Sequence, residues 1–537
     1  MKMRIFVRQI GFDYQAEVER MTCLFFEEDI VTFEDTGSPD LEARVQLHED
    51  NRTIQARAEL LEKGELRSSA TYEQPLPLGT DHATRRKRSK QTVLHALHDC
   101  LADFTGSGQP WGILTGVRPL KLVHGMLEQG KTRAEIQDNL AKDYRIAPDR
   151  IELLLDISDA QLQTVPDLYQ ISNQASIYVG IPFCPTHCAY CTFPAYSMEE
   201  KYTYAFDFLK ALEKEFMAVG RFLREYQIPV TSVYLGGGTP TSLNAPELEF
   251  LMEVIYREIP GGEAWAKRSS ESLAQAIVGR DAGQQAHGGI WREFTVEAGR
   301  PDTITPERVE VMRRYHVNRI SVNPQTFKAQ TLKTIGRGHT PDIVDRRYHL
   351  VKEAGFENIN MDMILGLPGE ELNDVRFTRE RIEALMPDSV TVHTMSFKRT
   401  AVVNREKQRF EIPHTQLVRM MMRETDEWAR TLGYRPYYVY RQKDILGNLE
   451  NIGYAKPGKE SVYNICIMEE RQCIIGLGGG ASTKLIGPGG KSYGRHGNPR
   501  EPKAYIDSID SVIEKKMYLL KNLYESVLQA NALSGLS

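Results

Sequence analysis

The sequence predicts an α/β fold built around a partial (β/α)6 barrel, with an α+β domain before it and an extension after it. Three observations lead to this prediction. From about residue 175, short apolar runs alternate with helical stretches. A cluster of three cysteines directly follows the first of these runs, and polar residues follow several of the others.

The first 170 residues are expected to form the α+β domain, whose role the sequence does not reveal. Its expected elements are a strand at 5–7, a helix at 14–26, a hairpin pairing 43–47 with 53–56, and a helix at 83–104. Two basic segments, 85–90 and 116–121, begin helices in this domain. Each is either a solvated face or an anion-binding patch.

Residues 171–394 are expected to form the barrel. Its strands are predicted at 177–179, 232–235, 294–297, 319–322, 358–364 and 389–392. Helices are predicted between them at 202–226, 246–258, 306–316, 342–354 and 372–384. Repeated strand–helix units predict a parallel sheet with right-handed crossovers, and six units leave the barrel open on one side. The cysteines follow the first strand, on the face where such folds carry their chemistry.

Two segments depart from this alternation. Residues 261–290 are rich in Gly, Ala, Ser and Gln, and we interpret them as a flexible surface insertion, with a lid as the alternative. Residues 395–537 are expected to form a mostly helical domain that caps the substrate. This region contains an aromatic stretch at 434–441 and a glycine-rich turn at 476–483.

The composition restricts the function. The chain has 537 residues, 41% of them hydrophobic and 26% charged, as in ordinary globular proteins. A net charge of -5 argues against a general nucleic-acid binder. No apolar stretch approaches the ~20 residues of a membrane span, and the N-terminal residues lack the apolar run of a signal peptide. We therefore expect a cytoplasmic protein, in whose reducing surroundings clustered cysteines bind metals. Separately from the composition, we expect it to be a monomer.

The cysteines that carry the clearest signal are Cys184, Cys188 and Cys191, spaced C-x3-C-x2-C. Three thiolates on one loop can ligate a metal centre. With His187 as a fourth ligand they could form a structural zinc site. Without it they could bind an iron–sulfur cluster that keeps one iron open to another ligand.

Further candidates lie at the ends of later strands. The second strand runs into Gly236-Gly-Gly-Thr-Pro-Thr241, where glycines allow close approach of the backbone and present N–H groups. A tight turn would use the same residues. Polar residues that follow the next strands could equally be helix caps or surface residues: Glu297, Asn323, Gln325, Arg337 and Asp362.

Together these motifs resemble those of the oxygen-independent coproporphyrinogen III dehydrogenases of the radical S-adenosylmethionine (SAM) superfamily. The resemblance rests on three motifs: Tyr178-Val-Gly-Ile-Pro-Phe-Cys184, the glycine turn, and Asp362-Met-Ile-Leu-Gly-Leu-Pro368. It spans about residues 170–490. Thr115–Lys121 and Tyr440–Lys443 resemble the HemZ-type branch in particular.

The resemblance implies a [4Fe–4S] cluster held by Cys184, Cys188 and Cys191, with one or two SAM molecules per chain. The residues implied in SAM binding are Tyr178, Tyr190, Gly237, Glu297, Gln325, Arg337 and Asp362, with Gly238 and Thr239 at a second SAM. Two departures stand out: Gly180 replaces a histidine common in the family, and Glu297 lies in Glu-Ala-Gly-Arg-Pro rather than Glu-x-x-Pro.

The implied reaction converts coproporphyrinogen III to protoporphyrinogen IX. A 5′-deoxyadenosyl radical takes a hydrogen from each of two propionates, and loss of CO₂ and an electron leaves vinyl groups. The electron donor would be a reducing protein such as flavodoxin or ferredoxin. Candidates to bind the substrate are Lys398, Arg399, Arg435, Arg441 and Lys443, with Tyr437, Tyr438 and Tyr440 as packing surfaces or ordinary core. The alternatives are a haem-binding chaperone without this activity and another radical SAM reaction on a tetrapyrrole.

Overall fold

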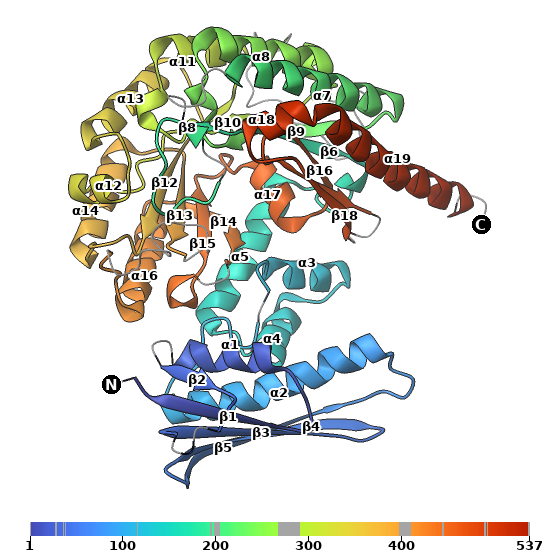
Figure 1. The fold of residues 1–537 in the computed structure, drawn as a ribbon, viewed down its shortest axis with the longest axis vertical. Coiled ribbons are helices and arrows are strands. Elements are labelled where there is room, and N and C mark those ends of the chain that lie inside the picture. Colours follow the sequence, from blue (N-terminus) through green and yellow to red (C-terminus); the bar gives the residue numbers. More distant parts are fainter. Residues whose placement is uncertain are drawn as a thin grey trace. The chain divides into compact units, whose positions relative to one another are not determined.

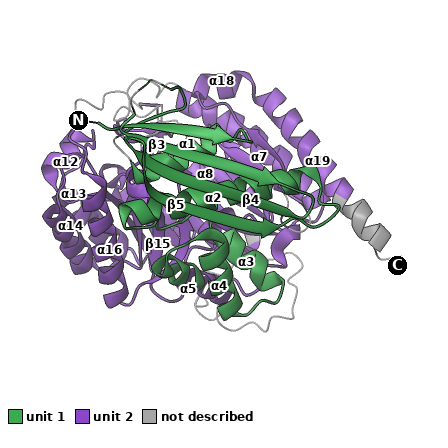
Figure 2. Cartoon of the chain, turned by 90° about the horizontal axis from the view of Figure 1, so that it is seen from below, with its two compact units in different colours: residues 1–155 green, residues 156–537 purple. Residues whose placement is uncertain are grey.

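The computed structural model describes most of the chain as two compact units, residues 1–155 and 156–537 (Figure 2). The described residues are 2–26, 29–35, 37, 39–114, 116–193, 196–197, 204–266, 290–396, 410–442, 445–487, 490 and 492–534. No helix among them is both long and apolar enough to cross a membrane.

The first unit contains a five-stranded sheet with helices packed against it (Figure 1). Its elements are β1 (Arg4–Ile10), α1 (Gln15–Phe25), β2 (Ile30–Thr32), β3 (Leu41–Glu49), β4 (Thr53–Glu62), β5 (Glu65–Pro75), α2 (His82–Thr105), α3 (Leu120–Glu128) and α4 (Arg133–Tyr144). The sheet order is β2-β1-β3-β4-β5. The predicted hairpin is present as β3 and β4, whose alternate side chains are buried in a core shared with α1 and α2.

The border between the units lies inside helix α5 (Pro148–Thr164), earlier than the predicted border at residue 170. The reason is packing, because the C-terminal half of α5 belongs to a core of the second unit. Ala160 is buried there beside Tyr437. Gln161 donates to the backbone oxygen of Tyr437 and to Glu469 Oε1, each at 3.0 Å.

The second unit is built on an 11-stranded sheet whose middle is the predicted series of six parallel strands. These are β6 (Ala175–Ile181), β9 (Val230–Gly237), β10 (Glu293–Val296), β11 (Arg319–Ser321), β12 (Ile359–Leu365) and β13 (Ser389–Thr394). The helices that follow them are α7 (Ala205–Glu225), α8 (Ala245–Glu258), α11 (Pro306–Arg314), α12 (Ala329–Thr334), α13 (Pro341–Glu353) and α14 (Leu372–Leu385). They cover the outside of the curved sheet (Figure 1). The fold is therefore the predicted partial barrel.

The region after residue 394 continues this sheet on both sides. Its elements are α16 (Thr415–Thr431), β14 (Arg435–Tyr440), β15 (Asn451–Ala455), α17 (Val462–Glu469), β16 (Cys473–Gly478), β17 (Ser482–Ile486), β18 (Ser492–Gly497), α18 (Pro502–Asp507) and α19 (Ile509–Ser534). Strand β15 pairs antiparallel with β13, and β16 pairs parallel with β6. The predicted domain border at 394 therefore does not coincide with a border between compact units, and the described residues of this region form five strands as well as helices.

The predicted insertion at 261–290 is described only at its two ends, because residues 267–289 lie outside the described part. Its first residues form the short helix α9 (Gly262–Ala266). The Trp265 side chain is buried and donates from Nε1 to the backbone oxygen of His316 at 3.1 Å. The start of this segment thus packs against the rest of the second unit.

A buried charge network supports the wall of the barrel. The Glu215 carboxylate on α7 and the Lys516 ammonium on α19 form an ion pair in which both side chains are fully buried. The same carboxylate accepts hydrogen bonds from Tyr505 Oη at 2.6 Å, Asn498 Nδ2 at 2.9 Å and the Gly478 backbone N–H at 2.8 Å. The network therefore joins α7, α18 and α19 to the end of β16.

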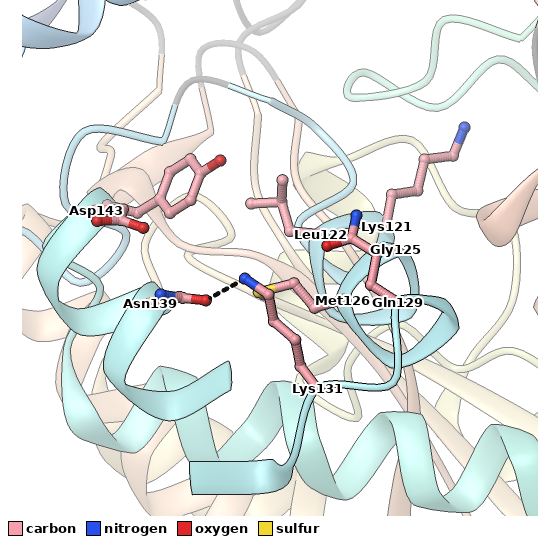
Figure 3. Close-up of a pocket in the computed structure, with 9 residues that line it drawn as sticks. Lys121, Leu122, Gly125, Met126, Gln129, Lys131, Asn139 and Asp143 are labelled. Atoms are coloured by element: carbon pink, nitrogen blue, oxygen red, sulfur yellow. Dashed lines mark hydrogen bonds between the residues drawn. The ribbon is translucent and has the colours of Figure 1, made fainter. Parts of the chain in front are cut away.

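The first unit has a pocket of about 280 Å³ (Figure 3). It lies between α3 and α4, which contribute most of its lining: Lys121, Leu122, Gly125, Met126, Gln129, Lys131, Asn139, Asp143 and Tyr144. Lys131 Nζ donates to Asn139 Oδ1 at 2.6 Å across it, whereas Lys121 extends away from this pair. The pocket contains Lys121 of the basic segment 116–121 but none of the residues implied in binding the cluster or SAM.

Candidate cluster and SAM site

The three cysteines lie on the loop that follows β6. Cys184 ends the short strand β7 (Phe183–Cys184), which pairs with β8 (Tyr196–Ser197). Cys188 is buried, whereas Cys184 and Cys191 are half-buried. The backbone N–H of Cys191 donates to the Cys188 oxygen at 3.0 Å, so a tight turn connects these two thiols. The His187 side chain is exposed, and across the described residues no three Cys, His, Asp or Glu side chains could hold a single metal ion.

Contacts with later segments secure the cysteine loop. Thr186 Oγ1 donates to the Gly336 oxygen at 2.9 Å, and the Ala189 backbone N–H donates to the Ile335 oxygen at 2.9 Å. Cys184 Sγ lies 3.3 Å from Thr239 Oγ1. Burial raises the pKa of the Cys184 thiol to about 12. A bound cation such as iron would favour the thiolate form at this position.

The glycine turn lies against the cysteine loop through its backbone. The Gly238 and Thr239 N–H groups donate to the oxygens of Ile181 and Phe183, each at 2.7 Å. A Cβ on Gly238 would come within 2.5 Å of the Phe183 oxygen. These two N–H groups are thus occupied within the protein, and the turn positions the loop that carries Cys184. The backbone of the glycine turn thus makes the predicted close approach, and the segment that it approaches is the cysteine loop.

The departure at Gly180 also has a structural reason. A Cβ at this position would lie 2.6 Å from the Gly479 backbone oxygen, because β16 runs directly beside β6. On the other side, a Cβ on Gly478 would lie 2.4 Å from the Gly180 oxygen. A histidine therefore cannot replace Gly180 unless β16 moves.

Arg337 faces the cysteine loop from the segment after α12. Its guanidinium is buried and donates to the oxygens of Asn323 at 2.6 Å and Gly299 at 2.9 Å, and to Tyr190 Oη at 3.3 Å. Arg337 Nε is buried, and no hydrogen-bond partner for it exists among the described residues. Arg337 thus joins Tyr190, next to Cys191, to the ends of β10 and β11.

Sequence reasoning missed Arg300, a second guanidinium at the cysteine loop. It lies in the Glu-Ala-Gly-Arg-Pro segment, and its Nη1 is 3.8 Å from Cys188 Sγ. The departure from the family's Glu-x-x-Pro pattern was the available signal, but spacing alone does not show where the side chain points.

Two acidic residues, Glu297 and Asp362, form the other side of the site. Burial, together with the nearby Asp362 charge, raises the pKa of Glu297 to about 8. Burial acts the same way on Asp362, but His393 and Asn360 outweigh it and hold the pKa of that carboxyl below its usual value. Asp362 Oδ2 accepts from Asn323 Nδ2 at 2.7 Å and lies 3.6 Å from His393 Nε2. At neutral pH the site therefore pairs a protonated Glu297 with an ionised Asp362.

Gln325 adopts an unusual backbone conformation at this edge. Its φ is +66°, and its backbone bridges to β12 through bonds with the Asp362 oxygen at 2.9 Å and the Ile364 N–H at 3.0 Å. Its side chain is buried, and within the described part of the chain Gln325 Oε1 has no hydrogen-bond partner. A buried acceptor of this kind is costly unless a ligand or water satisfies it.

Three tyrosines stack beside Glu297. Tyr178 on β6 lies 6.1 Å from Tyr234 on β9, measured between ring centroids, and Tyr463 on α17 lies 4.3 Å from Tyr234. Burial and the Glu297 charge raise the pKa of Tyr178. Sequence reasoning found Tyr178 but not Tyr234 or Tyr463. Tyr463 is more than 280 residues from Tyr178, so only the tertiary fold brings the two together.

The residues that the sequence suggested for substrate binding differ in burial and position in the structure. Tyr437 and Tyr438 are buried in the core beside α5. Arg435 is exposed, whereas Arg441 is buried with its Nη2 donating to Asn448 Oδ1 at 2.7 Å. Tyr440 is half-buried at the end of β14. Lys398, Arg399 and Lys443 lie outside the described residues.

Comparisons with known proteins place this site in a family. A sequence model of the radical SAM superfamily matches residues 178–382. The oxygen-independent coproporphyrinogen-III oxidase-like protein HemZ of Bacillus subtilis is 42% identical over 465 residues, which cover 86% of this chain and 88% of HemZ. The heme chaperone HemW of Bacillus subtilis is 28% identical over 336 residues, covering 62% of this chain and 76% of HemW. The solved coproporphyrinogen III oxidase HemN of Escherichia coli is similar with a TM-score of 0.47 and 20% identity, covering 64% of this chain and 71% of HemN.

The fold and the three-cysteine loop thus define a radical SAM protein. Within that superfamily the chain belongs to the family of HemZ, the oxygen-independent coproporphyrinogen III oxidase-like proteins. The cofactors of radical SAM proteins are a [4Fe–4S] cluster and SAM. His187, the fourth ligand in the alternative zinc site, has an exposed side chain.

The residues present fit both cofactors. Three thiols lie on one loop, and two guanidinium groups, those of Arg300 and Arg337, face Cys188. Gln325 Oε1 and Arg337 Nε are buried polar atoms for which the described residues provide no partner. A polar ligand such as SAM would satisfy them.

Proposed function

We propose that this protein oxidatively decarboxylates the propionate side chains of coproporphyrinogen III to vinyl groups, forming protoporphyrinogen IX. The observation that carries the proposal is the 42% identity with HemZ, an oxidase-like protein, over 86% of the chain. A match of this length must include residues of both compact units.

In this proposal the chain's own residues hold and orient the two cofactors. Cys184, Cys188 and Cys191 would hold the cluster. SAM would be bound by Tyr178, Tyr190, Gly237, Glu297, Gln325, Arg337 and Asp362, with Gly238 and Thr239 assigned to a second SAM. When bound, the cluster and SAM supply the radical that takes hydrogen from the substrate. The protonated Glu297 can donate a hydrogen bond and the ionised Asp362 can accept one, so the pair can distinguish polar groups of the bound nucleoside.

The substrate carries four carboxylates and must meet positive charge. Among the described candidates, Arg435 is exposed but lies level with Ser389, at the opposite end of the strands from the cysteine loop. Arg441, just after the other end of β14, is buried and donates to Asn448. We propose that Tyr440 and Arg441, at the end of β14 that lies on the side of the cysteine loop, face the substrate. We further propose that a small reducing protein, such as flavodoxin or ferredoxin, supplies electrons to a monomeric enzyme.

A second candidate function is haem binding and delivery without decarboxylation. The observation that favours it is the 28% identity with the heme chaperone HemW over 62% of the chain. The HemZ match is longer and closer, and for this reason we place decarboxylation first.

An anaerobic assay separates the two functions. The reconstituted protein is mixed with coproporphyrinogen III, SAM and dithionite, and CO₂, methionine and protoporphyrinogen IX are measured. The proposal expects two CO₂ per substrate, with protoporphyrinogen IX as the product. Methionine release without CO₂, together with stoichiometric haem binding, would support the chaperone function and contradict the decarboxylase.

A further inference from the structure

Arg300 is almost fully buried, with 2% of its side chain exposed. It follows β10 and precedes the short 3-10 helix Pro301–Thr303. Its Nε and Nη2 donate to the two carboxylate oxygens of Asp302 at 3.1 and 3.0 Å. This two-bond pairing orients the plane of the guanidinium and directs its remaining nitrogen, Nη1, at the cysteine loop.

Nη1 makes three contacts, all within the cysteine loop. It donates to Thr186 Oγ1 at 2.9 Å and to the Thr186 oxygen at 3.3 Å, and it lies 3.8 Å from Cys188 Sγ. Thr186 is in turn bonded to the Gly336 oxygen at 2.9 Å. Arg300 therefore holds the loop at the residue two positions before Cys188 and presents an N–H group to the sulfur itself.

Arg337 also lies beside Cys188, and its Nη1 and Nη2 groups have further partners. It donates to the oxygens of Gly299 and Asn323 and to Tyr190 Oη. Its position matches one that the family uses for SAM. Arg300 is not among the residues implied in SAM binding, so its contacts to the loop need a separate explanation.

We propose that Arg300 is a positioning residue that holds the Cys188 thiolate and raises the reduction potential of the cluster bound there. Hydrogen bonds and positive charge at a ligating sulfur withdraw electron density from the cluster. They stabilise the reduced form, which carries one more negative charge, and the low dielectric of a buried site strengthens the effect. Asp302 opposes the effect by adding a negative charge at the guanidinium.

The test measures the ratio of reduced to oxidised cluster. The full chain is reconstituted with iron and sulfide and equilibrated with redox mediators at one fixed solution potential, without SAM or substrate. Electron paramagnetic resonance then gives the reduced fraction, in which each cluster has gained one electron from dithionite. The variants are R300Q, R300K and D302N. The matched control is R308Q, because Arg308 bonds to the oxygens of Leu243 and Thr303, and among the described residues none of its hydrogen bonds reaches a cysteine.

The proposal expects opposite changes in two variants at unchanged iron content. In R300Q the reduced-to-oxidised ratio falls about tenfold, which corresponds to ~59 mV for a one-electron couple. In D302N, which keeps the arginine and removes the carboxylate charge, the ratio rises. R300K keeps the charge and loses the two-bond pairing, so its ratio lies between those of the wild type and R300Q. R308Q keeps the wild-type ratio.

A wild-type ratio in R300Q, with full iron content, would overturn the proposal. If R300Q takes up too little iron to measure, R300K and D302N decide. A D302N ratio equal to or below that of the wild type would then overturn the proposal, and a purely structural role for Arg300 would remain. None of these readouts depends on the proposed decarboxylation, so that function can fail while this inference stands.

Discussion

The two sides of the site are built differently, one on a loop and one on strands. The cysteines lie within eight residues of sequence, and their loop is held by contacts with Thr239, Arg300 and Ile335. The acidic side rests on β10 and β12, where the register of parallel strands places Glu297 near Asp362. The cysteine motif can thus be recognised in the sequence alone, although remote residues hold its loop in place. The proximity of Glu297 and Asp362, in contrast, is visible only once the strands are arranged in the sheet.

The largest expected effect is on the loop side. Replacing Cys188 by serine (C188S) removes one of three cluster ligands, so iron and sulfide content fall to a small fraction of wild type and SAM cleavage is lost. Cys23, half-buried in the first unit, provides the control, and C23S should keep wild-type iron content. Full turnover in C188S would contradict the assignment of this loop.

The next largest effect tests the buried ion pair that joins α7 to α19 behind the cysteine side of the barrel. Replacing Lys516 by methionine (K516M) leaves the Glu215 carboxylate buried without its counter-ion, which should lower the free energy of unfolding of the second unit by about 3–5 kcal/mol. The measurement is urea unfolding followed by circular dichroism. The exposed neighbour Lys515 supplies the control, and K515M should change the free energy by less than about 0.5 kcal/mol. Equal midpoints for the two variants would show that the pair does not support the barrel.

A smaller effect, dependent on pH, is expected on the strand side. The folded-state pKa of Glu297 is raised to about 8 from a usual value of 4.5, so the folded state holds this proton more tightly than the unfolded state. The resulting stability is fully present below about pH 4.5 and is lost as the pH rises through 8. In the cluster-free protein, E297Q should therefore gain stability relative to wild type between pH 6 and pH 9. Thermal unfolding at the two pH values measures it, and parallel curves for both proteins would show that Glu297 is ionised at neutral pH.

The smallest expected effect tests whether His187 belongs to the metal ligands of the cysteine loop. His187 lies between two of the cysteines but is exposed. Its replacement by alanine (H187A) should leave iron content and SAM cleavage unchanged within error. Metal analysis after reconstitution checks this expectation, and a loss of bound metal would restore His187 as a ligand.

The regular parts of the fold could be read from the sequence. All six barrel strands were predicted within a few residues, because each is a short apolar run bounded by turns and followed by a helix. The domain border at 394 could not be read in the same way. Strand β16 pairs with β6, nearly 300 residues earlier, and nothing in its local sequence indicates that partner.

The same distinction applies to the site. The cysteines, Glu297 and Asp362 were found from spacing and from positions at strand ends. Arg300 and Tyr463 were missed, since their importance lies in what they touch across the fold. The glycine turn was recognised as a place of close approach, but its partner, the backbone at Phe183, became visible only in three dimensions.

The ion pair between Glu215 and Lys516 has a consequence for the order of folding. The two residues are separated by 301 positions, and the carboxylate also bonds to Asn498 and Tyr505 near the end of the chain. During synthesis, helix α7 leaves the ribosome long before these partners exist, and a charged carboxylate cannot be buried alone without a large cost. The wall beside β6 is therefore completed only when α19 docks against α7.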